Sequence, residues 1–165
     1  MSYNSKRVMV RNVLYDSWVP LWRILAGLIV GIILAVLGGW AGLFLNLLIG
    51  YQWSLAIHQN IQMVAIGTGA GLGAYLAWLN SNLRWYWILG TLALVVAAST
   101  LGAYVGRAYG HGVDPTYLWS RSAVDNAIHL GAAIAGVLIS TAIGLAGQIY
   151  TANFRSAEGV GRRWF

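Results

Sequence analysis

Three long stretches of the chain carry no charge and are almost wholly apolar. No Lys, Arg, Asp or Glu occurs between Arg23 and Arg84, between Arg84 and Arg107, or between Asp125 and Arg155. A transmembrane helix needs about 20 apolar residues, so the first stretch accommodates two such helices and each of the others one. The pattern predicts an all-α protein, an integral membrane four-helix bundle. Its spans are expected at about 21–48, 54–79, 85–106 and 122–150.

Polar segments flank the predicted spans at both ends of the chain. Residues 1–20 form a basic leader in which apolar residues recur at helical spacing, which predicts an interfacial amphipathic helix at the N-terminus. An unstructured basic flank is the alternative. Pro20 is expected to separate the leader from the first span, because proline suits the start of a helix. Residues 151–165 form a basic tail.

Glycine recurs at helical spacing in the second predicted span. Gly67 and Gly71 share one side of this helix, and Gly69 and Gly73 share roughly the opposite side. Each Gly-x-x-x-Gly step lets another helix backbone come close in lipid. This span is therefore expected in the middle of the bundle, packed from both sides. A seam of small residues in the first span predicts packing against the second span or against a neighbouring copy.

Charge and composition fit a membrane protein. The chain is 59% hydrophobic and 8% charged, whereas soluble domains carry about 25% charged residues. The net charge of +6 arises at the ends of the spans, where the membrane explains it, so nucleic acid is not an expected partner. The absence of cysteine excludes disulfides and thiolate chemistry.

The distribution of basic residues predicts the orientation. With four spans, both termini share one side of the membrane, and that side holds eight of the ten Lys and Arg residues. The positive-inside rule then places both termini in the cytoplasm, N-in and C-in. The expected location is a bacterial cytoplasmic or photosynthetic membrane. The eight residues are Lys6, Arg7, Arg11, Arg23, Arg84, Arg155, Arg162 and Arg163.

Three histidines are the main candidates for chemistry, and this topology puts all of them toward the outer side. His58 lies about 7 Å into the second span and His129 about 9 Å into the fourth, at 1.5 Å per residue. Because these spans run in the same direction, the two rings are expected at nearly matching depth. His111 lies in the loop above them. Asp125, one turn before His129, is placed to accept its ring N–H.

The histidines predict a tetrapyrrole site. Imidazole ligates haem iron and the magnesium of chlorophyll or bacteriochlorophyll, which makes His58 and His129 candidate metal ligands, with His111 as a further one. Glycine-seamed, aromatic-rich helices would also suit a carotenoid or a lipid tail. The alternative is that each histidine bonds only a neighbour or water near the membrane interface.

Three amides near the start of the second span allow two interpretations. Gln59, Asn60 and Gln62 either form hydrogen bonds between helices or contact a quinone or the polar group of a pigment. Gln62 shares the face of His58 and is therefore the candidate cofactor contact.

A small, charge-poor chain with almost no domain outside the membrane is typical of a subunit of a larger membrane assembly. We expect a structural or cofactor-holding subunit in electron transfer or light harvesting, in contact with lipid and with other subunits or copies of itself. A small channel or transporter, with His58, Asn60 and Gln62 lining a polar entry, is the alternative. No hydrolase or phosphate-binding motif is present, so an enzyme is not expected; an interfacial enzyme would have to use His111, Asp114 and His129.

Overall fold

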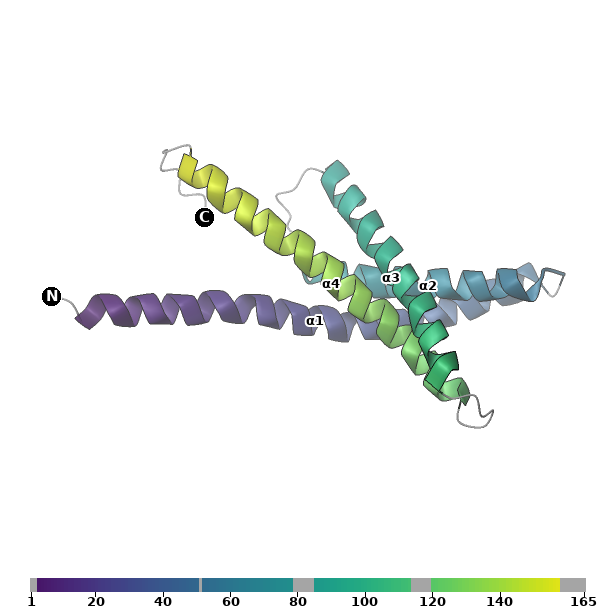
Figure 1. Cartoon of the computed structure of the whole chain (residues 1–165). Helices are drawn as coiled ribbons and strands as arrows, with labels where there is room; N and C mark the ends of the chain where they lie inside the picture. Colours follow the sequence, from purple (N-terminus) through teal and green to yellow (C-terminus); the bar gives the residue numbers. More distant parts are fainter. Residues whose placement is uncertain (1–2, 51, 79–84, 114–119, 158–165) are drawn as a thin grey trace.

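The described part of the chain is helical almost throughout. The computed structural model describes residues 3–50, 52–78, 85–113 and 120–157, and these form four α-helices (Figure 1). The predicted all-α class is therefore confirmed. The helices are α1 (Tyr3–Ile49), α2 (Leu55–Leu76), α3 (Trp85–Val113) and α4 (Ser120–Ala157).

Three of these helices are long and apolar enough to cross a membrane, which indicates a membrane protein. The segments are Val19–Ile49 in α1, Trp85–His111 in α3 and Val124–Gly147 in α4. Among the described helices, α2 is the exception, since its polar start and its glycines lower its hydropathy. It nevertheless carries a large share of the core, including Met63, Ile66, Ala70, Ala74 and Tyr75. A helix covered by other helices does not have to be apolar on every side.

The helices form two antiparallel hairpins that cross each other. The α1–α2 hairpin and the α3–α4 hairpin lie at a wide angle (Figure 1). In the described part of the chain α2 and α4 each contact all three other helices, whereas α1 and α3 do not contact each other. The start of α1 and the end of α4 lie at the same end of the molecule (Figure 1).

Glycines on two sides of α2 set its central position. A Cβ atom on Gly73 would lie 2.7 Å from Gly31 Cα in α1, and one on Gly71 would lie 2.8 Å from Val96 Cα in α3. Gly69 and Gly67 contact the same two neighbours, at Leu34 and Thr100 respectively. The prediction that this helix is packed from both sides is confirmed.

The small-residue seam of α1 packs within the chain. Gly38 and Gly42 contact Ala65 of α2, while Gly31 lies beside both Ala70 of α2 and Ala133 of α4. Of the two predicted partners for the seam, the structure therefore gives α2, and it adds α4.

The predicted break at Pro20 is wrong. Pro20 lies inside α1, which runs unbroken from Tyr3 to Ile49. Proline removes one backbone donor, and helices tolerate this loss in a membrane when local adjustments satisfy the freed carbonyl. At 1.5 Å per residue α1 is about 70 Å long, more than twice the hydrocarbon thickness of a bilayer. The structure thus has one continuous helix where the sequence predicted a leader helix followed by a span.

Candidate functional site

Hydrogen bonds at the start of α2 connect this helix to α3 and to α1. The Tyr104 hydroxyl of α3 donates to Asn60 Oδ1 at 2.8 Å, and the Arg107 guanidinium donates to Gln59 Oε1 at 2.9 Å. On the other side, Asn46 Nδ2 of α1 donates to the His58 backbone carbonyl at 3.0 Å. For Gln59 and Asn60 the structure therefore bears out hydrogen bonding between helices.

Two histidines share one hydrogen-bonding arrangement. His129 Nδ1 lies 2.6 Å from the Asp125 backbone carbonyl, and His58 Nδ1 lies 3.2 Å from the Ser54 carbonyl. A carbonyl oxygen can only accept, so Nδ1 is the donor, and Nε2 of the neutral ring keeps its lone pair. The sequence pointed to the Asp125 side chain as the partner. The structure gives the backbone oxygen of the same residue instead, because that carbonyl lies one helical turn before the ring.

One of these rings, that of His129, lines an open cavity of about 480 Å³. It lies among α1, α2 and α4 and brings His129, Gln62 and Asp125 together, three of the four residues predicted to contact a cofactor. Most of the other lining side chains are apolar. They are Ile32, Val36, Gly39, Trp40, Leu43, Asn126 and Leu130.

Gly39 allows the His129 ring to approach α1. A Cβ atom at this position would lie 3.3 Å from His129 Nε2 and 3.4 Å from Ile66 Cγ1. The next residue, Trp40, lines the same cavity and is 69% exposed. Sequence reasoning found neither residue, although the lone tryptophan in the middle of an apolar stretch was the available indication.

His58 does not line this cavity. Asn46 of α1 contacts the His58 backbone, whereas Gly39 of α1 faces His129. These two α1 positions are about 10 Å apart at 1.5 Å per residue. The two histidines therefore lie at different levels along α1. The reason is that α4 crosses α1 and α2 at a wide angle, so counting residues from the span ends does not give relative depth (Figure 1).

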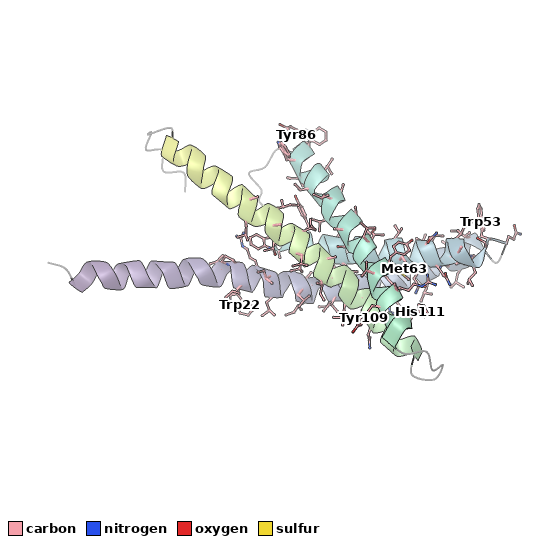
Figure 2. The ribbon with its side chains drawn as sticks, viewed as in Figure 1. Trp22, Trp53, Met63, Tyr86, Tyr109 and His111 are labelled. Carbon is pink, nitrogen blue, oxygen red and sulfur yellow. The ribbon has the colours of Figure 1, made fainter. Side chains whose placement is uncertain are left out.

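The remaining candidates lie elsewhere. His111 belongs to α3 and not to a loop, and it is exposed near the end of that helix (Figure 2). Asp114, proposed for an interfacial enzyme, lies outside the described residues. Asn60 lines a cavity between α1 and α2, whereas Gln62 lines the cavity beside His129.

The described residues include no group of three His, Cys, Asp or Glu side chains that could hold a metal ion. A tetrapyrrole needs fewer ligands from the protein, because the macrocycle supplies four ligands to the metal and one imidazole is sufficient. Compared with known proteins, the chain matches no family model, no curated protein and no solved structure. No relative therefore supplies a ligand or an activity.

Proposed function

We propose that this protein is a multi-pass membrane subunit that holds a tetrapyrrole, a haem or a chlorophyll-type pigment, in the cavity around His129. One observation carries the proposal. His129 Nδ1 donates to a backbone carbonyl, which leaves Nε2 as the atom that can ligate a metal, and the ring lines a largely apolar cavity. Metal-ligating histidines almost always donate their other ring N–H in this way.

The lining residues fit such a group. The cavity volume of about 480 Å³ lies within the range of about 300–1,000 Å³ that is usual for small-molecule sites. Trp40 and Leu43 offer an aromatic and an apolar surface to a flat ring, and Gln62 and Asn126 offer amides to its polar substituents. When bound, the metal macrocycle would supply electron transfer or light absorption. His129 would hold the group through its imidazole, and His58 has no part in this site.

The same proposal places the protein in a bilayer with both termini in the cytoplasm. Three apolar helices support the membrane location, and the shared end of α1 and α4 agrees with an even number of spans (Figure 1). The excess of basic residues on that side supports the orientation. In this arrangement α2 crosses the membrane between neighbouring helices that pack on two of its sides, and other subunits or further copies pack against the exposed apolar faces.

An absorption spectrum tests the proposal. Protein purified from its native membrane in mild detergent should show an intense visible band in a fixed ratio to protein. His129→Leu should abolish the band, because the lost Nε2 is the metal ligand. His58→Leu is the matched control, since His58 has the same Nδ1 bond but lies outside the cavity, and it should leave the band unchanged.

A colourless wild-type preparation would overturn the proposal. A band that survives His129→Leu, in protein of unchanged helicity by circular dichroism, would overturn the assignment of the ligand.

A further inference from the structure

The cavity beside His129 is polar at one end and apolar at the other. Helices α1 and α4 pass it in opposite directions, since Gly39 lies beside His129 and Gly31 lies beside Ala133. Asp125, one turn before His129, therefore lies at the end of the cavity that is beyond Gly39 along α1. The α1 residues that line the cavity before Gly39 are all apolar and lie at the opposite end. Polar substituents of a bound group can therefore be accommodated only at the Asp125 end.

The polar end of the cavity carries a negative charge. Asp125 is the one charged side chain in the lining; it is exposed and forms no ion pair with another described residue. The two arginines whose side chains the structure describes lie elsewhere, because Arg23 stacks on Trp78 and Arg107 donates to Gln59. An anionic substituent in this cavity would therefore meet a like charge and no described cation.

Two amides complete the polar end. Gln62 of α2 and Asn126 of α4 line the cavity, and neither side chain is hydrogen-bonded to another described residue. A Cβ atom on Gly42 of α1 would lie 3.1 Å from Gln62 Cα, so Gln62 lies beyond Gly39 along α1, at the same end as Asp125. Amide N–H groups donate to keto and ester oxygens as well as to carboxylates. The lining thus offers donors to a neutral polar group and repels an anionic one.

We propose that the cavity selects a tetrapyrrole whose carboxyl groups are esterified, as in chlorophyll-type pigments, over one with free propionates, as in haem. Asp125 disfavours free carboxylates through like-charge repulsion, and Gln62 and Asn126 donate to keto and ester oxygens. Asp125 is then a specificity residue, whereas His129 holds the metal. This inference rests on the function proposed above and decides between its two candidate groups.

A matched pair of probes tests the charge. Zinc protoporphyrin carries free propionates and its dimethyl ester carries none, while the zinc of both accepts an imidazole ligand. The full chain in uncharged detergent is titrated with each probe, and absorbance gives the ratio of the two dissociation constants. Asp125→Asn should lower the preference for the ester about fivefold, the effect of removing one like charge at close range in water. The backbone carbonyl that accepts from His129 Nδ1 is retained in this variant.

Two further variants show whether the charge acts locally. Asn126→Asp adds a second carboxylate at the polar end and should raise the preference for the ester about fivefold. Asp16→Asn is the matched control, because it removes the same charge from α1 at a position about 24 Å before Ile32, the first lining residue, at 1.5 Å per residue. It should leave the ratio unchanged.

A ratio that Asp125→Asn leaves unchanged would overturn this inference, as would one that Asn126→Asp fails to raise or that Asp16→Asn lowers equally. Haem in protein purified from its native membrane, identified by the pyridine haemochrome spectrum, would overturn it as well. Failure of both probes to bind, or binding that survives His129→Leu, would instead overturn the proposed function, so the two failures are distinguishable.

Discussion

Helices α1 and α2 lie side by side but differ in what surrounds them. α1 has large exposed side chains along most of its apolar part, among them Ile33, Leu37 and Trp40, and it packs through a narrow seam of small residues. α2 packs on two glycine-lined sides and begins with amides that bond to α3. The comparison indicates that a helix packed on two sides by other helices can be glycine-rich and partly polar, whereas a helix with large exposed side chains along most of its length is apolar.

A bulky side chain on a glycine of α2 should give the largest effect. Gly69 lies against the Leu34 carbonyl of α1, so Gly69→Leu would push the two helices apart. We expect the protein to lose about 3 kcal/mol of stability or more, the upper range for overpacking. Gly90→Leu is the control, because nothing lies within 4 Å of a Cβ at Gly90 in α3. Equilibrium unfolding in mixed detergent micelles measures both variants, and equal stabilities would contradict the central position of α2.

How much of this could be predicted from sequence depends on whether a feature lies within one helix or between helices. The two-sided packing of α2 follows from 100° per residue along a single helix, so the glycine spacing predicted it correctly. The relative level of His58 and His129 depends on how one hairpin crosses the other, and no local pattern encodes that crossing. Gly39 could not be identified from the sequence for the same reason, because its contact with His129 forms only where α4 packs against α1. At Pro20 the prediction relied on the preference of proline for the start of a helix, but the structure has one continuous helix through this residue.

A substitution at the contact between α4 and α1 should give an effect of intermediate size. A Cβ at Gly39 would lie 3.3 Å from His129 Nε2, a distance that forces the ring to shift by a few tenths of an ångström. Gly39→Ala should therefore move the absorption band of the bound cofactor and cost about 1 kcal/mol of stability, at the low end for overpacking. Gly31→Ala on the same helix is the control, since its Cβ would make ordinary contacts at 3.4 Å or more. The difference spectrum of the two variants provides the measurement, and identical spectra would argue against a ligand on His129 Nε2.

The smallest effect is expected where the polar start of α2 meets α3. Tyr104→Phe removes the hydroxyl that donates to Asn60 Oδ1 and leaves the ring in place. Hydrogen bonds between membrane helices contribute about 0.6 kcal/mol on average, because the unfolded state in the membrane also finds partners. A double-mutant cycle of Tyr104→Phe with Asn60→Ala should give a coupling energy of about this size. Tyr109→Phe changes a hydroxyl on an exposed ring further along α3 and should show no coupling to Asn60→Ala. A coupling near zero for Tyr104 as well would mean that this hydrogen bond contributes no stability, and the polar residue at position 60 would then have to be explained by a ligand.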